Sequence, residues 1–202
     1  MDFNNISKSD LDMNSKTGEF IDLFNNVQKT RTQLGELYKE TDKFPDIDTS
    51  KIVDMSELFK DMKEFNGDIS KWDVSKVYYM GGMFYDCKSF DKPLNDWDIS
   101  KVTNMSDMFR GCKSFNQDIS KWDVSNVTNM YCTFYDCKSF NQDLSNWDVS
   151  NVKDCERTFN GCSIKFKYIP KFNSLANEQR DFSQTSEARR RVSSPSGILG
   201  YL

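Results

Sequence analysis

Acidic and hydroxyl side chains recur at a constant interval along this chain and come closest to a catalytic pattern. An aspartate and, two positions later, a serine stand in each copy: Asp48 and Ser50, Asp73 and Ser75, Asp98 and Ser100, Asp123 and Ser125, and Asp148 and Ser150. Two carboxyl groups can act as general acid and general base when different surroundings push their pKa values apart. Because these aspartates have nearly the same neighbours in sequence, hydrolytic chemistry is the least favoured interpretation.

The chain contains no histidine, which removes the usual general base, the common nucleophile pairs and the commonest zinc ligand. Four of the six cysteines recur with the same period as the aspartates, at Cys87, Cys112, Cys137 and Cys162. Such a column is typical of a small buried apolar residue. Zinc would need paired spacing, which the interval from Cys132 to Cys137 matches poorly, while Cys132 and Cys155 lie outside the column and could be exposed. We expect no enzyme, no metal and no cofactor.

The elements that position these residues are repeats. Aromatic and methionine residues recur with the same period in four further columns: Trp72, Trp97, Trp122 and Trp147; Phe59, Phe84, Phe109, Phe134 and Phe159; Phe65, Phe90, Phe115 and Phe140; and Met55, Met80, Met105 and Met130. We interpret them as five copies, at 47–71, 72–96, 97–121, 122–146 and 147–171, with Ile47 in the first tryptophan position. Because one copy cannot bury its apolar face alone, the copies must stack into one continuous core.

The spacing of apolar residues within each copy predicts one strand followed by one short helix. Trp97 and Ile99 alternate with polar residues, as in a strand, whereas Val102, Met105 and Met108 have the spacing of a helical or 3-10 turn. The predicted fold is an α/β repeat, a leucine-rich-repeat-like right-handed solenoid with a parallel β-sheet on one face and short helices on the other. The aspartates and serines would face outward and stack, so that their repulsion must be offset. We favour a structural role for them, with a face that binds a partner as the alternative.

The pattern W-D-[VI]-S-x-V-x-x-M-x-x-x-F-x-x-C-x-S-F resembles the BspA-type leucine-rich repeats, which occur in mycoplasma surface proteins, gut bacteria, protists and some large DNA viruses. The resemblance spans residues 47–171 and implies a solenoid that serves protein contact or adhesion without known catalysis. The usual bacterial members are secreted or lipid-anchored. This chain shows no basic segment followed by an apolar core at its start, so we expect no secretory signal and a cytoplasmic or virion location.

The flanking segments differ from the repeats. Residues 1–18 are polar, 19–46 predict an amphipathic capping helix with a linker, and 172–202 predict a C-terminal cap with a basic extended tail. A helix that binds a partner is the alternative for Glu19–Glu40. Candidate contact residues in the tail form a basic cluster and an apolar end: Arg189, Arg190 and Arg191, then Ile198, Leu199, Tyr201 and Leu202.

Composition narrows the function. The mean hydropathy is −0.70, and no apolar run approaches the roughly 20 residues of a membrane helix. From Gly161 onward, seven basic residues against three acidic ones give +4, which leaves −8 for the remainder of the net −4. Nucleic acid is therefore an unfavourable partner. The first hypothesis is a non-enzymatic scaffold that binds protein partners within a larger assembly, and the alternative is a cell-surface adhesin or carbohydrate-binding protein.

Overall fold

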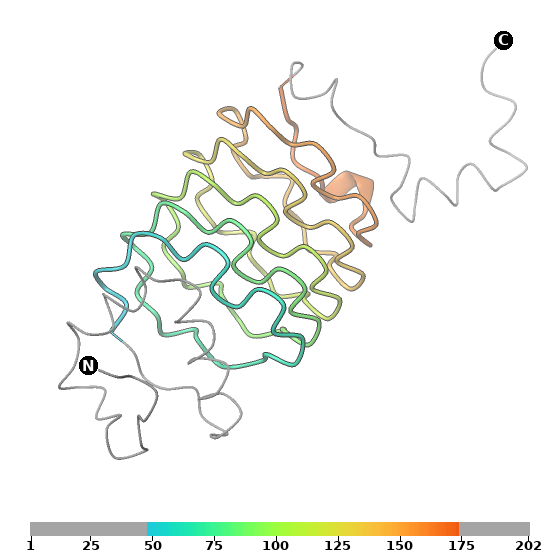
Figure 1. Ribbon diagram of the computed structural model, residues 1–202. Coiled ribbons are helices and arrows are strands. Elements are labelled where there is room, and N and C mark those ends of the chain that lie inside the picture. Colours follow the sequence, from blue (N-terminus) through green and yellow to red (C-terminus); the bar gives the residue numbers. More distant parts are fainter. Residues whose placement is uncertain (1–47, 174–202) are drawn as a thin grey trace, which may run out of the picture.

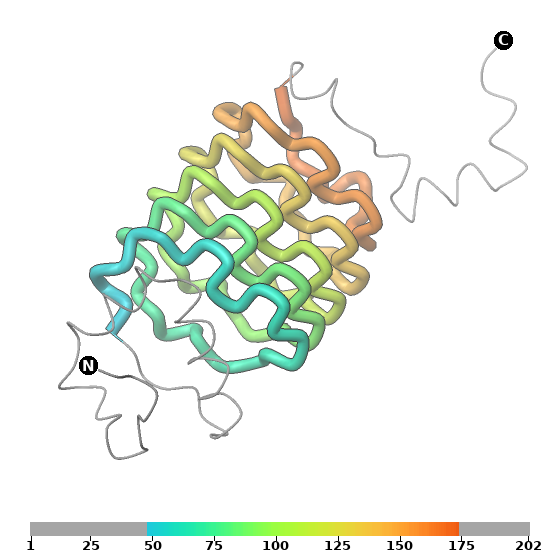
Figure 2. The backbone as a smooth tube through the Cα atoms, in the orientation of Figure 1, coloured from blue at the N-terminus to red at the C-terminus, as the bar shows by residue number. Residues whose placement is uncertain are grey.

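The repeats stack side by side as successive coils of one elongated body. The computed structural model describes residues 48–173, and Figure 1 shows the coils following one another in chain order. The tube in Figure 2 shows that each coil repeats the path of the one before it. The predicted helix at Glu19–Glu40 and the predicted contact residues of the tail lie outside the described residues. A repeat domain is thus the architecture of the chain.

Turns, and not strands, make up the coils. Within residues 48–173 the one named element is a 3-10 helix, η3, at Phe166–Tyr168. Four single-residue parallel bridges join the coils: Asp54 to Tyr79, Tyr79 to Asn104, Asn104 to Asn129 and Asn129 to Asp154. The predicted parallel β-sheet through the tryptophan segment is wrong for this part of the chain. The right hand of the winding stays a prediction.

The segment that follows each tryptophan forms a turn and not a strand, because its backbone amides donate hydrogen bonds to acceptors two or three residues earlier. The amide of Val102 donates to the carbonyl of Ile99 at 2.8 Å, and the amide of Ser100 donates to the side chain of Asp98 at 3.0 Å. Both bonds lie within one copy, so they are unavailable for pairing between strands. The alternation of Trp97 and Ile99 with polar residues therefore comes from a turn that places both apolar side chains in the core.

The predicted short helix is also wrong, because left-handed residues interrupt it. Two positions in each copy have positive φ: Glu57, Gly82, Asp107, Cys132 and Arg157 at the first, and Asp61, Asp86, Gly111, Asp136 and Gly161 at the second. A right-handed helix cannot include such residues. Instead, the amides of Met83, Tyr85 and Cys87 each donate to the carbonyl three positions earlier, at 3.2, 3.0 and 3.0 Å, which gives three turns in succession.

The amides between these turns bond to the next coil. Four amides of one copy donate to four carbonyls of the next: Met80 to Asn104 at 3.0 Å, Gly82 to Ser106 at 2.7 Å, Phe84 to Met108 at 2.9 Å and Asp86 to Arg110 at 2.7 Å. The donors are every second residue of this segment, so every second peptide group points along the stack. The backbone ladder between copies therefore forms in the segment where the sequence predicted a helix.

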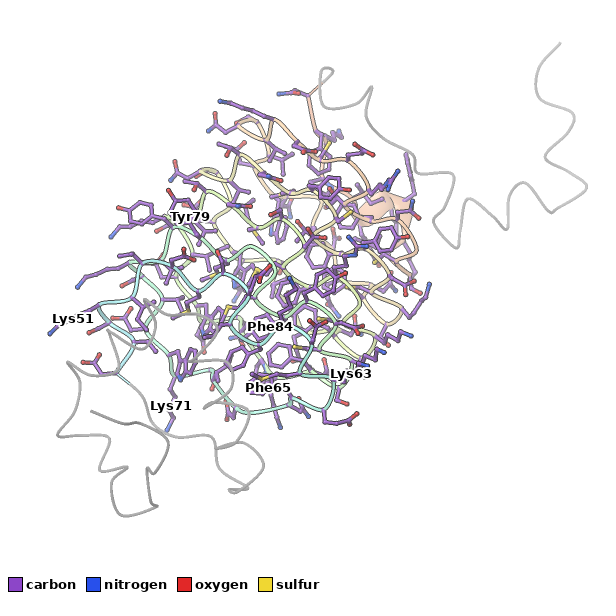
Figure 3. The ribbon with its side chains drawn as sticks, in the orientation of Figure 1. Lys51, Lys63, Phe65, Lys71, Tyr79 and Phe84 are labelled. Carbon is purple, nitrogen blue, oxygen red and sulfur yellow. The ribbon has the colours of Figure 1, made fainter. Side chains whose placement is uncertain are left out.

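Aromatic columns fill the core. The ring of Phe109 stacks on Phe84 at 5.4 Å, on Phe134 at 5.5 Å and on Phe115 at 4.2 Å between ring centroids. Trp122 is buried, and its indole N–H donates to the carbonyl of Leu94 at 2.9 Å. The prediction that the tryptophan and phenylalanine columns are core is confirmed. In Figure 3, Phe65 and Phe84 lie inside the stack, whereas Lys51 and Tyr79 project from it.

Candidate interaction surface

The predicted aspartate and serine ladder forms a row of local turns. All five aspartates are exposed, Ser150 is exposed, and the other four serines are half-buried. In every copy the serine amide donates to the aspartate Oδ1 at 3.0 Å: Ser50 to Asp48, Ser75 to Asp73, Ser100 to Asp98, Ser125 to Asp123 and Ser150 to Asp148. Asp and Asn favour such turns because the short side chain caps the backbone two positions further on.

These bonds offset the repulsion expected between stacked carboxylates. Hydrogen bonds from the side chain and the backbone of the following serine lower the pKa of Asp73, Asp98 and Asp148. At Asp98 the neighbouring charge of Asp73 raises the pKa, but it is the smallest of the contributions. A structural role is therefore sufficient to explain why the ladder recurs, and the partner-binding face stays a prediction.

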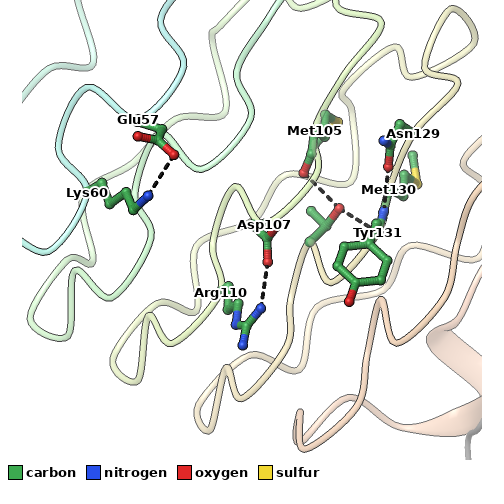
Figure 4. A network of polar contacts seen from close by, with 9 residues as sticks. Glu57, Lys60, Met105, Asp107, Arg110, Asn129, Met130 and Tyr131 are labelled. Carbon is green, nitrogen blue, oxygen red and sulfur yellow. Dashed lines mark hydrogen bonds and ion pairs between the residues drawn. The ribbon is translucent and has the colours of Figure 1, made fainter. Parts of the chain in front are cut away.

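The same turn recurs at two other positions of the copy. The amide of Ser120 donates to Asp118 at 2.9 Å, and the amide of Tyr131 donates to the side-chain oxygen of Asn129 at 2.9 Å. Figure 4 shows the second of these bonds. Aspartate and asparagine thus recur in this chain chiefly as turn residues.

The cysteine column has a packing and hydrogen-bonding role. The thiol of Cys112 donates to the carbonyl of Phe84 at 2.9 Å, and that of Cys137 donates to Phe109 at 2.8 Å. Burial raises the pKa of both thiols well above its usual range and raises the pKa of Cys162 to about 12.

Cys132 and Cys155, whose exposure the sequence left open, are buried as well. Burial makes poor nucleophiles of both thiols, and at Cys132 burial also raises the pKa. Across residues 48–173, no three acidic, cysteine or histidine side chains lie close enough together to hold a metal ion.

A surface that sequence reasoning missed runs along the stack. We name it the tyrosine–arginine ladder: Tyr85, Arg110 and Tyr135, which follow the phenylalanine column directly in sequence. The guanidinium of Arg110 lies 5.2 Å from the ring centre of Tyr85 and 4.9 Å from that of Tyr135. Lys60 extends the row, with its ammonium 5.4 Å from the Tyr85 ring. All four side chains are half-buried, so each keeps part of its surface accessible.

Ion pairs hold the cations of the ladder in place. Arg110 Nη1 donates to Asp107 Oδ1 at 3.1 Å, and Lys60 Nζ donates to Glu57 Oε1 at 2.6 Å, as Figure 4 shows. Burial disfavours the charge of Arg110, but its hydrogen bond to Asp107 helps raise its pKa, so the side chain stays charged. The sequence signal was weak, because this position holds a different residue type in neighbouring copies.

The repeat pattern, the stacked coils and the aromatic core agree with the comparison to protein families. The family model described as "Mycoplasma protein of unknown function, DUF285" matches residues 19–118 and again 92–194. The chain belongs to the DUF285 family. This family is the BspA-type leucine-rich-repeat-like repeat of mycoplasma surface proteins, so the resemblance is confirmed.

The DUF285 family carries no known catalytic role. Neither curated proteins nor solved structures give a match to the chain. In the part that the structure describes, no helix is both long enough and apolar enough to cross a bilayer.

Proposed function

We propose that this DUF285 repeat domain is a non-enzymatic module that binds other proteins and serves as a scaffold in a larger assembly. The observation that carries the proposal is the tyrosine–arginine ladder. Tyrosine and arginine are enriched among the residues that dominate binding energy at protein interfaces. Here Tyr85, Arg110 and Tyr135 lie in one row on a rigid stack, with their contacts to each other already made.

Preorganisation is the physical reason that such a row suits binding. Ordering a flexible side chain at an interface costs about 0.5–1.5 kcal/mol. Arg110 is already held between two rings and by Asp107, so a partner would order it at a smaller cost. The regular stacking of the coils also supports a leucine-rich-repeat-like solenoid, and the family resemblance implies that its winding is right-handed. Its location in the cytoplasm or in a virion stays a prediction.

A pair of double variants tests the proposal. Tyr85→Ala with Tyr135→Ala removes both rings of the ladder, and Tyr78→Ala with Tyr79→Ala removes two tyrosines that are 43% and 49% exposed elsewhere on the stack. We expect a partner purified with the wild-type chain from its native source to bind the ladder variant at least tenfold more weakly. The control variant should bind as the wild type does. Equal affinity of the ladder variant and the wild type, measured by calorimetry with the purified partner, would refute the proposal.

A cell-surface adhesin or carbohydrate-binding protein is the second candidate. The family match favours it, because the repeat is that of mycoplasma surface proteins. Tyrosine rings and an arginine in a row can also stack on sugars and bond to their hydroxyl groups. Binding of the labelled chain to a glycan array, lost in the ladder double variant, would support this candidate over the scaffold. Binding to a purified protein partner with no glycan signal would favour the scaffold.

A further inference from the structure

The backbone ladder between coils ends in unpaired amides at the C-terminal end of the stack. In the preceding copy three amides donate to the last coil: Cys132 to Glu156 at 3.0 Å, Phe134 to Thr158 at 2.8 Å and Asp136 to Asn160 at 2.8 Å. The equivalent amides of the last coil belong to Arg157, Phe159 and Gly161. Among the described residues these three amides have no acceptor.

All the peptide groups of this ladder point the same way. Each one has its carbonyl toward the preceding coil and its N–H toward the next, as the bond from Gly82 to Ser106 shows. Aligned peptide dipoles add, whereas in an ordinary β-sheet they alternate and largely cancel. The positive pole of the ladder therefore lies at the last coil, where the amides of Arg157, Phe159 and Gly161 stand.

The net side-chain charge of the last copy, residues 147–171, has the same sign. Residues 162–173 contain Lys165, Lys167 and Lys171 and no acidic residue, whereas residues 137–148 contain one lysine and two aspartates. All three lysines are exposed, and Asn173 stands where the earlier copies have an aspartate. Over the whole copies, 147–171 has five basic and three acidic residues, whereas 122–146 has one basic and three acidic, so the last copy gains base at an unchanged number of acids.

We propose that this C-terminal end, formed by the amides of Arg157, Phe159 and Gly161 together with Lys165, Lys167 and Lys171, binds an extended acidic polypeptide segment of another protein. The segment supplies backbone carbonyls to the amides and carboxylates to the lysines. The site is separate from the tyrosine–arginine ladder and does not depend on the function proposed for it.

The geometry favours a polypeptide over a compact anion. Inside the stack each set of amides is met by carbonyls from alternate residues of one chain, as in Ser106, Met108 and Arg110. An extended strand likewise presents carbonyls from alternate residues along one edge. Addition of such a segment to an open backbone edge is a recurring mode of peptide recognition.

Two other occupants of the site are possible, namely the chain's own C-terminal residues and a second copy of the chain. Residues 174–202 of the chain itself carry four arginines and three acidic residues, so they are not the acidic segment that the site attracts. A second copy is the other competitor, because the carbonyls of Ser56 and Leu58 in the first coil meet no donor within residues 48–173. Both are outcomes of the test below.

Amide hydrogen exchange on the isotopically labelled full chain tests the proposal at the backbone. In the free chain, we expect the amides of Arg157, Phe159 and Gly161 to exchange quickly, while those of Cys132 and Phe134 are protected. A peptide of ten glutamates at low salt should slow exchange at the three terminal amides at least tenfold. A peptide of ten lysines, with the same backbone, should leave it unchanged.

Charge-reversal variants test the lysines. Lys165→Glu, Lys167→Glu and Lys171→Glu together should weaken binding of the glutamate peptide at least tenfold. Lys63→Glu, Lys71→Glu and Lys113→Glu make the same change in net charge at three lysines that are also exposed, and this control should bind nearly as the wild type does. Unchanged circular dichroism in both variants excludes unfolding as the cause.

Four results would overturn the proposal. An equal loss in the control variant would show attraction to overall charge alone. Terminal amides already protected in the free chain at every concentration would show that the chain's own residues cover the site. Protection that rises with protein concentration would identify a second copy as the occupant. Absence of protection with the glutamate peptide would exclude the site itself.

Discussion

Truncation of Trp122 in the central coil is the sharpest test of the stacked core. Its side chain is 4% exposed, its ring lies 6.2 Å from that of Phe109, and its indole N–H donates to Leu94. Trp122→Ala removes all three contributions and leaves a cavity between two coils. Because each coil is stabilised by both of its neighbours, a central cavity weakens two interfaces at once.

The expected loss follows from the buried area. A buried tryptophan removes roughly 150–250 Å² from water, and about 25 cal/mol per Å² gives about 4–6 kcal/mol as an upper bound. The hydrogen bond adds about 1 kcal/mol, but the carbonyl of Leu94 keeps a second donor in the amide of Trp97 at 3.1 Å. A net loss of about 3–5 kcal/mol in the free energy of unfolding agrees with large-to-small substitutions in other cores.

Urea denaturation, followed by circular dichroism and by the fluorescence of the remaining tryptophans, measures this loss. Trp122→Phe is the matched control, because the chain itself places a buried phenylalanine, Phe172, one repeat period after Trp147. That variant keeps a ring and loses the N–H, so we expect about 1–2 kcal/mol. A loss below about 1 kcal/mol for Trp122→Ala, or equal losses for the two variants, would refute the reasoning.

Three further predictions address the turns and the columns. Cys112→Ala should lower the free energy of unfolding by about 1–2 kcal/mol. Cys112→Ser should lower it by less, because serine can still donate a hydrogen bond to the carbonyl of Phe84. Urea denaturation of both variants measures the two losses. Gly111→Ala should cost about 1–3 kcal/mol in the same assay, because φ is +74° and a Cβ would lie 3.0 Å from a carboxylate oxygen, whereas Gly81→Ala, with a closest approach of 3.3 Å, should cost less. The lowered pKa of Asp98 contributes stability above the ordinary aspartate pKa that is lost as the pH falls through the folded-state pKa. Urea midpoints from pH 7 to pH 2 should therefore fall less steeply in Asp98→Asn than in the wild type, and parallel curves would contradict this.

The sequence could predict only those surface residues whose type is the same at equivalent positions of the copies. The sequence singled out Asp123 and Ser125 because they recur, and the structure explains them by the same kind of turn that Asp118 and Asn129 form. The sequence did not predict the tyrosine–arginine ladder, because the residue type at this position differs from copy to copy. A contact between equivalent positions of two copies that share no residue type leaves no periodic signal in the sequence.

The period and the core were determined by the sequence alone. Stacked copies place equivalent residues against one another, so each buried column must keep one shape, and Phe109 and Trp122 are repeated for that reason. The backbone conformation within a copy was decided only by the tertiary structure. Of the ten left-handed positions, three are glycine, so most carry no local sequence signal.

Pairing with the next coil favours these left-handed conformations, because both left-handed positions of a copy carry amides that bond to the next coil. The amide of Asp107, at a φ of 54°, thereby reaches the carbonyl of Tyr131 at 2.8 Å. The bond needs a neighbouring coil to accept it, so one copy read by itself looks like a strand followed by a helix. The aspartate and serine pairs, which first suggested chemistry, hold the turns of a stack that exists only when all of its copies are present.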